Sequence, residues 1–226
     1  MKHIVVTGSL AFDYILDFPG SFEEHILPHK IKTLSVSFLV DKVNKNFGGV
    51  SGNISYNLAL LGQKPTILAS AGNKDFEEYQ THLETCGVDT SQIHKVNDEF
   101  SATAYIMTDK NNCQITGFYE GAMHSDSDLS LPGGSSFIVI APTHPKAMAK
   151  FVKEAKKRNL PYLFDPAQQI PALERQILQE GVDGAEIIIG NDYEIALILK
   201  RTGLSKKDLL AKAAIVITTL GKRGSL

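Results

Sequence analysis

The sequence contains few cysteines, no tryptophan and almost no net charge. Cys86 and Cys113 form no CxxC pair, and two thiols in a chain of 226 residues do not make a disulfide framework. We therefore expect both thiols to be reduced and the protein to be cytoplasmic. The 23 basic and 25 acidic residues give a formal net charge of −2, which provides no electrostatic footprint for nucleic acid or a membrane surface. We expect neither as a partner.

Long apolar runs are also missing. The N-terminal segment MKHIVVTGSLAFDYI has one lysine, and its apolar run is shorter than a signal peptide or a transmembrane helix requires. We expect Val5 and Val6 to begin a first strand instead. The seven histidines form no HExxH motif and do not pair with the cysteines, so the sequence predicts no zinc site. A GxSxG nucleophile elbow is absent as well.

Hydrophobic residues make up 43% of the chain, enough for a sizeable core. Several short apolar runs lack polar alternation, which is typical of strands buried on both faces of a parallel sheet. These runs are residues 4–6, 66–69, 137–140, 162–164, 186–189 and 215–218. Helical spacing lies between several of them, at residues 54–61, 146–158 and 192–201. The alternation predicts an α/β fold with right-handed crossovers.

Two stretches break this rhythm. Residues 34–40 alternate between polar and apolar, which indicates a half-exposed strand, and residues 102–118 are typical of a hairpin with its turn at 109–112. Together they predict a small β lid, at about residues 14–45 and 99–120, over the carboxyl ends of the core strands. An exposed apolar strand face often pairs with a second subunit, so we also expect a possible homodimer through the lid.

The most informative segment is FGGVSGNISYNLALLG, residues 47–62. The paired glycines Gly48 and Gly49 let a ligand approach the backbone closely, and free amides at the start of the following helix would face that ligand. Asn53, in the first turn, can both donate and accept hydrogen bonds to hydroxyl groups. A tight turn from the lid to the core, followed by a helix start, explains the same residues equally well.

The pattern GGxxxNxxxxLAxLG resembles the N-terminal signature of the ribokinase family, the PfkB-type carbohydrate and nucleoside kinases. The resemblance implies that Gly48, Gly49 and Asn53 contact the sugar hydroxyls of a substrate. Asp13 matches an acidic residue of that family that binds ribose hydroxyls, and a carboxylate can accept two hydrogen bonds from a vicinal diol. An exposed turn aspartate is the alternative. Thr7-Gly8-Ser9 makes no dinucleotide fingerprint, because the later glycines of GxGxxG are missing.

Two later segments resemble other motifs of the family. Asn191 and Glu194 match its NxxE motif, which implies a nucleotide contact for Asn191 and a water-mediated magnesium contact for Glu194. A helix N-cap completed by Glu194 is the alternative, and both interpretations can hold together. Thr219, Gly221 and Gly224 match the TxGxxG turn beside the nucleotide phosphates, for which a two-glycine hairpin turn is the alternative. Asp165-Pro166 also agrees with the family, and the matches run in the family's order from residue 4 to 225.

The resemblance implies a single ribokinase-like domain over residues 1–226, a three-layer α/β/α fold with a mostly parallel central sheet and a small β lid. It also implies an ATP-dependent phosphotransferase that uses Mg²⁺ and phosphorylates a primary hydroxyl group of an adenosine-like nucleoside. Residues 44–52 and 118–122 look closest to bacterial adenosine-kinase-like members. The aromatic side chains of Phe38, Phe118 and Tyr119 would stack on a base or form the core of the lid.

Two alternatives stay open. One is a ribokinase- or fructokinase-type enzyme that acts on a free sugar, and the other is a non-catalytic relative that binds a sugar or a nucleoside. The family's second signature, a glycine-rich DTxGAGD segment that supplies an anion hole and the general base, has no match. We therefore nominate no catalytic residue, place the expected base beyond Leu226, and expect this chain alone to have little or no kinase activity.

Overall fold

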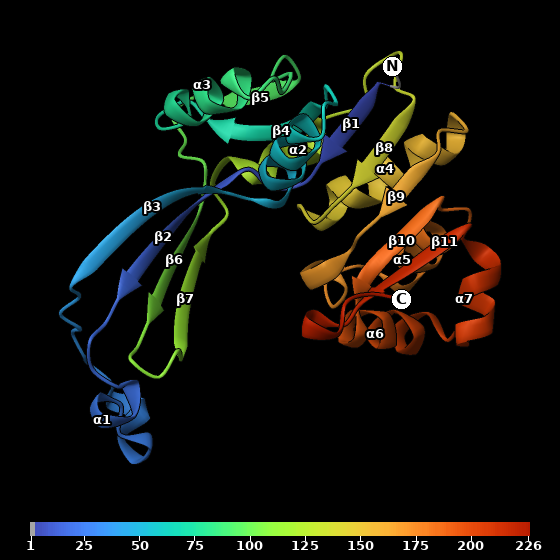
Figure 1. Ribbon diagram of the computed structural model, residues 1–226. Helices are drawn as coiled ribbons and strands as arrows, with labels where there is room; N and C mark the ends of the chain where they lie inside the picture. Colours follow the sequence, from blue (N-terminus) through green and yellow to red (C-terminus); the bar gives the residue numbers. More distant parts are fainter. Residues whose placement is uncertain (1–2) are drawn as a thin grey trace.

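The computed structural model describes residues 3–226, which form two sheets (Figure 1). The larger one, here called the parallel sheet, has seven strands in the order β11-β10-β9-β8-β1-β4-β5, and all of its pairings within the described residues are parallel. Its strands are β1 (Ile4–Thr7), β4 (Thr66–Gly72), β5 (Ile93–Val96), β8 (Phe137–Ile140), β9 (Tyr162–Phe164), β10 (Ile187–Asn191) and β11 (Ile215–Thr219). The six apolar runs all lie in this sheet, so the predicted parallel α/β core is confirmed.

Most of the helices lie on one face of the parallel sheet. The side chains Ile140, Phe164 and Ile188 of this face pack against α4 (Pro145–Lys157), α5 (Arg175–Val182), α6 (Asp192–Thr202) and α7 (Lys206–Lys212) in the largest apolar cluster. Helix α4 turns a continuous stripe of buried residues to the sheet: Ala147, Met148, Phe151, Val152 and Ala155. The helical spacing predicted for residues 146–158 and 192–201 is confirmed.

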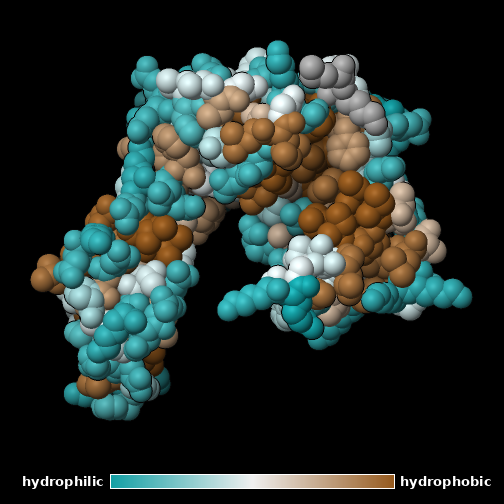
Figure 2. Space-filling model, viewed as in Figure 1, coloured by the Kyte–Doolittle hydropathy of each residue, from teal (hydrophilic) through white to brown (hydrophobic). Residues whose placement is uncertain are grey.

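The opposite face is covered by α2 (Val50–Leu60), which packs on Val6 and Val139, while α3 (Glu77–Thr85) packs beside β4. Helices on both faces give the predicted three-layer α/β/α arrangement. Figure 2 shows apolar surface continuing past α2 over β9 to β11. Leu61, which follows α2, and Ile215, which begins β11, are both exposed. The strands at this end therefore have the composition of a sheet buried on both faces, although helices cover only one face within residues 3–226.

The second sheet, here called the lid sheet, has the order β3-β2-β6-β7 and extends away from the parallel sheet (Figure 1). Its strands are β2 (Ala11–Asp17), β3 (Lys42–Gly48), β6 (Ala102–Thr108) and β7 (Gln114–Tyr119). Strands β6 and β7 are antiparallel, and Asn112 has a positive φ of 61° in the turn between them. The predicted hairpin at residues 102–118 is confirmed.

The strand predicted at residues 34–40 is wrong. This stretch has no regular structure and follows a short helix, α1 (Phe22–His25), and a 3₁₀ segment, η1 (Pro28–Thr33). Phe38 packs edge-on against Phe18 and Phe22, with ring centroids 4.9 and 5.2 Å apart. Phe38 thus belongs to an aromatic cluster, and the apolar residues of this stretch do not form one face of a strand. The strand that pairs with β2 is β3, whose polar sequence KVNKNFG gave no strand signal.

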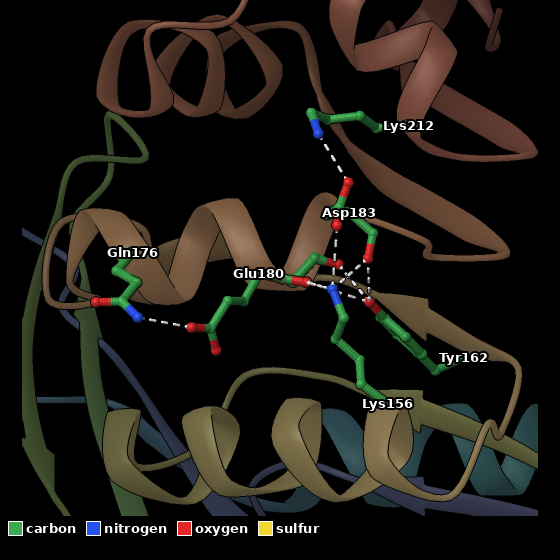
Figure 3. A network of polar contacts seen from close by, with 7 residues as sticks. Lys156, Tyr162, Gln176, Glu180, Asp183 and Lys212 are labelled. Carbon is green, nitrogen blue, oxygen red and sulfur yellow. Dashed lines mark hydrogen bonds and ion pairs between the residues drawn. The ribbon is translucent and has the colours of Figure 1, made fainter.

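A polar network ties helix ends together at the amino-terminal edge of the parallel sheet (Figure 3). Lys156, near the end of α4, donates to the backbone oxygen of Asp183 at 2.8 Å, and Lys212, at the end of α7, lies 2.7 Å from the Asp183 carboxylate. Tyr162 opens β9, and burial followed by the charge of Asp183 raises its pKa to about 12. Because cations here meet the negative ends of helices, the network reads as a structural tie.

We expect Asp183→Asn to lower the free energy of unfolding at pH 7 by about 0.5–1 kcal/mol, a small loss because these pairs are largely solvent-exposed. Hydrogen bonding to Lys212, and then to Lys156, holds the pKa of Asp183 below 3.8 in the fold. The contribution is therefore present above the unfolded pKa and is lost as the pH falls through the folded value. Urea unfolding should show the difference between wild type and variant at pH 7, and a smaller difference once the pH falls below 3.8.

Glu24→Gln is the matched control, because it removes a single exposed ion pair with Lys110 near the tip of the lid sheet. If Asp183→Asn lowers the free energy of unfolding no more than Glu24→Gln does, the network has no structural role.

Candidate functional site

The site residues predicted from sequence form two groups near the edge of the parallel sheet at which its strands end. Asp13, Gly48, Gly49 and Asn53 belong to the lid sheet and to the start of α2. Asn191, Glu194, Thr219, Gly221 and Gly224 follow the strands β10 and β11. The carboxyl ends of parallel strands meet at one edge of a sheet, which is the usual ligand position in such folds. The two groups thus border the junction between the lid sheet and the parallel sheet.

Asp13 and Gly48 lie against each other on neighbouring strands. A Cβ atom on Gly48 would overlap the Asp13 carboxylate, so the glycine leaves room for this side chain in its present position at the base of the lid sheet. Partial burial raises the pKa of Asp13, and the hydroxyl group of Tyr79 donates to the backbone oxygen of Gly48 at 2.8 Å. Burial, and then the charge of Asp13, raise the pKa of Tyr79. The Asp13 carboxylate packs over Gly48 and makes no hydrogen bond within the described residues, so its oxygens can accept hydrogen bonds from a ligand.

Gly49 sits at the start of α2 with a positive φ of 82°, and a Cβ there would lie 2.5 Å from the backbone oxygen of Ser9. Ser9 accepts hydrogen bonds from the first two amides of α2. Its hydroxyl oxygen accepts from the amide of Val50 at 3.2 Å, and its backbone oxygen accepts from the amide of Ser51 at 3.1 Å. The expectation that these amides face a ligand is therefore wrong for Val50 and Ser51. Gly49 therefore makes the tight turn that the sequence allowed as an alternative, and its contact with a substrate stays a prediction.

Asn53 is exposed in the first turn of α2. With Asn46, Phe47, Tyr56 and His82 it borders a surface depression of about 250 Å³ between α2 and α3. The side chain is accessible to a hydroxyl-bearing ligand, but the structure records no hydrogen bond from it to Asp13 among the described residues. It also has a neighbour in the helix, because the Asn57 side chain donates to its backbone oxygen at 2.8 Å.

One face of the lid sheet combines polar and aromatic side chains. The register pairs Asp13 with Asn46 on one side and Ala104 on the other, and Ala104 with Phe118. Directly paired residues point to the same face of a sheet, so these four form a row, here called the Asp13 row. Phe118 is 56% exposed, and Ala104 leaves a low point between it and the carboxylate.

The other two aromatic candidates lie elsewhere. Tyr119 belongs to the opposite face, where its hydroxyl group donates to Glu99 at 3.0 Å. Phe38 lies in the aromatic cluster with Phe18 and Phe22, beside α1. Only Phe118, of the three aromatic residues named from sequence, shares a face with Asp13.

Asn191 and Glu194 make a reciprocal capping box at the start of α6. The Asn191 side chain accepts from the Glu194 amide at 2.8 Å, and the Glu194 carboxylate accepts from the Asn191 amide at 2.7 Å. This is the capping alternative left open by the sequence. One carboxylate oxygen of Glu194 is used by the cap, and the other has no protein donor among the described residues. The capping geometry therefore leaves an oxygen at the edge of the sheet for a water or a cation.

Asp165 lies close to Glu194, because it directly follows β9, the neighbour of β10. Burial, and then the negative charge of Glu194, raise the pKa of Asp165 to about 6. Two carboxylates held together in this way disfavour each other's charge, which a cation would relieve. From sequence Asp165 had only minor support; its spatial pairing with Glu194 is the new information. Within residues 3–226 no cluster of three or more potential metal ligands occurs.

Thr219 pairs with Asn191 at the end of β11, and the turn that follows bends sharply. Gly221 and Gly224 both have positive φ, 58° and 84°, and nothing in the structure would meet a Cβ at either position. Their backbone conformation, and not crowding, requires glycine. Thr219 bridges to Ser225, which makes this the small hairpin that was the alternative interpretation. Lys222 and Arg223 add positive charge to the turn.

Comparison with known proteins gives matches over the whole chain. A model of the pfkB family of carbohydrate kinases matches residues 1–226. The nucleoside kinase of Methanocaldococcus jannaschii is 28% identical over 229 residues, which span 100% of this chain and 72% of the relative. The nucleoside kinase of Methanothermobacter thermautotrophicus is 27% identical over 232 residues, with the same coverage.

Solved structures agree with these sequence matches. The nucleoside kinase of Burkholderia thailandensis in complex with inosine has a TM-score of 0.85 and 30% identity, and the match covers 98% of this chain and 71% of that one. The Methanocaldococcus jannaschii nucleoside kinase, an archaeal member of the ribokinase family, has a TM-score of 0.88 and 26% identity, covering 100% and 72%. The resemblance to PfkB-type kinases and the ribokinase-like fold are confirmed.

Proposed function

This chain belongs to the pfkB family of carbohydrate kinases, and from that premise we propose that it acts in the phosphorylation of a purine nucleoside by ATP. The γ-phosphoryl group of ATP would pass to a primary hydroxyl group of the sugar, most simply the 5′-hydroxyl. Catalysis of this kind relies on positioning and on neutralising phosphate charge. The residues of this chain would bind and orient the two substrates.

The observation that carries the proposal is the Asp13 carboxylate lying over Gly48. A carboxylate with two accessible oxygens can accept both hydrogen bonds of a vicinal diol, such as the 2′- and 3′-hydroxyls of ribose. The glycine on the neighbouring strand leaves room for this carboxylate, which a side chain there would displace. Asn53, exposed nearby in α2, would add a further hydroxyl contact.

The Asp13 row favours a nucleoside over a free sugar. A base attached to a ribose at Asp13 would extend across Ala104 toward the exposed ring of Phe118, and stacking of a base on an aromatic ring contributes about 1–3 kcal/mol. A free sugar would leave this ring without a partner. The inosine bound to the relative from Burkholderia thailandensis supports the same substrate class.

The nucleotide would lie on the other side of the junction, beside β10 and β11. We assign Asn191, Thr219, Gly221 and Gly224 to it, because the turn bends its backbone toward the edge of the sheet and carries two basic side chains. A structure of the Burkholderia thailandensis enzyme with ADP and inosine supports binding of both ligands in one fold.

Asp165 and Glu194 would hold Mg²⁺ near the phosphates. The donor set fits: Mg²⁺ prefers oxygen ligands, keeps several waters, and usually takes one or two carboxylates together with substrate phosphates. The raised pKa of Asp165 fits as well, since it marks negative charge that lacks a counterion. When bound, the ion would neutralise phosphate charge, while this chain's own residues fix where the phosphates lie.

The first test compares ligands by calorimetric titration. We expect adenosine and inosine to bind and ribose and fructose to bind much more weakly. Asp13→Asn should weaken nucleoside binding by about 10- to 100-fold, the effect of losing hydrogen bonds to a charged group. Phe118→Ala should also weaken the binding of nucleosides and leave the affinity for ribose unchanged. Binding of ribose or fructose without any nucleoside binding would contradict the nucleoside assignment.

Tyr105→Ala is the matched control for Phe118→Ala. Tyr105 is an aromatic residue of the same sheet with similar exposure, 51% against 56%, but it stacks on Tyr14 on the opposite face. We expect its removal to leave nucleoside affinity unchanged. An equal loss in both variants would mean that the effect comes from the stability of the lid sheet.

The second test measures the thermal shift caused by Mg²⁺ with a non-hydrolysable ATP analogue. Because the pKa of Asp165 is about 6 in the fold, its carboxyl group is largely protonated below that pH and largely ionised above it. We expect the Mg²⁺-dependent shift to grow as the pH rises through about 6, and this growth to vanish in Asp165→Asn. Glu24→Gln, which removes an exposed pair with Lys110 near the tip of the lid sheet, is the control. An unchanged pH profile in Asp165→Asn would rule out this metal position.

The lid also carries exposed apolar side chains, which supports a homodimer through the lid. Leu27, Ile31 and Leu39 are among the exposed large apolar residues of the segment between β2 and β3. Exposed apolar clusters of this kind often mark an interface. We expect light scattering to give the mass of a dimer for the wild type and of a monomer for Leu39→Ser with Ile31→Ser. A monomeric wild type would dismiss the dimer.

A further inference from the structure

The 3₁₀ segment η2 (Gly121–Asp128) connects the two sheets, because it follows the lid strand β7 and leads toward β8 of the parallel sheet. It begins at Gly121, whose φ of 48° and close approach to the Phe100 backbone both require glycine. It then packs against β4 of the parallel sheet and against β6 of the lid sheet. This one short segment therefore touches both bodies that border the candidate site.

Two side chains of η2 make these contacts. Met123 is buried with Ala11 and Ala102, the first residues of β2 and β6, so it packs at the base of the lid sheet. Asp126 comes three positions later and is 1% exposed. In a 3₁₀ helix residues i and i+3 lie on the same side, so the two side chains point along one line of the segment. One contacts the lid sheet, and the other contacts the parallel sheet.

Asp126 is fully engaged by donors from the parallel sheet. Its carboxylate accepts from the backbone amide of Ser70 in β4, at 2.6 Å, and from the hydroxyl group of Thr143, in the loop between β8 and α4. Strand β1 pairs with β4 only as far as Leu68, so the Ser70 amide lies beyond the end of that ladder. The Asp126 carboxylate accepts the hydrogen bond that a neighbouring strand would otherwise accept from the Ser70 amide. This position is at the carboxyl ends of the parallel strands, next to β1, where the strand order changes direction.

Keeping a carboxyl group in this position is costly. Burial outweighs the hydrogen bonds and raises the pKa of Asp126 to about 7. An apolar side chain of similar size would avoid the cost of burying a charge, but it would leave the Ser70 amide and the Thr143 hydroxyl group without this acceptor. What an aspartate provides is direction, because two fixed donors orient it and with it the segment that carries it.

We propose that Asp126 is a positioning residue that holds the lid sheet at a fixed angle to the parallel sheet. It acts through Met123 and the base of the lid sheet, and it thereby fixes where Asp13 lies relative to the edge at Asn191 and Thr219. The consequence for nucleoside binding rests on the proposed function; the mechanical role of Asp126 does not. Without the carboxylate, η2 would keep its contact with the lid sheet and lose its orientation on the parallel sheet.

The two native cysteines give a direct measurement of this angle. Cys113 is exposed in the turn between β6 and β7 of the lid sheet, and Cys86 is partly exposed at the end of α3, which packs on the parallel sheet. Spin labels on both thiols report the distance between the two bodies by pulsed electron paramagnetic resonance. We expect one narrow distance distribution for the wild type and a broader or shifted one for Asp126→Ala and for Thr143→Val.

Three controls separate orientation from general damage. Ser127→Ala changes the next residue of η2, whose hydroxyl group bonds within the segment to His124, and should keep the wild-type distribution. Thr143→Ser keeps the hydroxyl donor and should restore it. Circular dichroism confirms that each variant is folded, and Thr143→Val decides the question if Asp126→Ala does not fold. Wild-type distributions in every folded variant that lacks the Asp126–Thr143 bond would overturn the proposal.

Ligand titrations on the same proteins link the angle to binding. We expect Asp126→Ala to weaken nucleoside binding by about tenfold and to leave ADP binding unchanged, because the nucleotide residues lie on the parallel sheet alone. Equal losses for both ligands would indicate general destabilisation and count against a positioning role. A wild type that binds no nucleoside would overturn the proposed function, while the label distances would still decide the role of Asp126.

Discussion

The close contact between residues 48–49 and residues 9–13 joins the three parts of the molecule that matter for its function. The Gly49 backbone lies against Ser9 and Ala11 so closely that a single Cβ would fill the gap, and Gly48 makes room for the Asp13 carboxylate. In the same place Ser9 binds the first amides of α2, which packs on the parallel sheet. Lid sheet, helix and parallel sheet therefore share one crossing point, and a substrate at Asp13 would bind at that point.

Much of the parallel core could be predicted from sequence, because each of its central strands is a continuous apolar run and three of its helices show helical spacing, at residues 54–61, 146–158 and 192–201. The helices α3 and α5 gave no such signal. The lid could be predicted only in part. Its hairpin has a turn signal. Strand β3, by contrast, is polar and exposed, and it forms because the chain returns to pair with β2. Residues 34–40 failed for the opposite reason: alternating apolar residues suggested a strand, although Phe38 packs in an aromatic cluster at the lid tip.

The candidate site divides in the same way. Motif resemblance found the glycines and the polar residues that follow strand ends, since these belong to local patterns. It did not find Ser9 as the partner of α2, Tyr79 behind Gly48, or Asp126 beneath the lid, because their partners lie 31 to 56 positions away in the chain. The NxxE pattern alone does not distinguish a helix cap from a nucleotide site. Asn191 and Glu194 bond to each other's backbone as a helix cap whether or not a nucleotide binds.

The two halves of the site stand on separate bodies, and this makes their relative orientation a functional quantity. Asp13 belongs to the lid sheet, while Asn191, Glu194 and Asp165 lie at the ends of strands of the parallel sheet. A displacement of about 1 Å between reacting groups is enough to slow a transfer reaction strongly. The attachments of the lid are therefore as important as the residues that would touch a ligand. Asp75, which accepts two hydrogen bonds from Ser101, and Asp126 both place a buried or half-buried carboxylate at such an attachment, where two donors determine its direction.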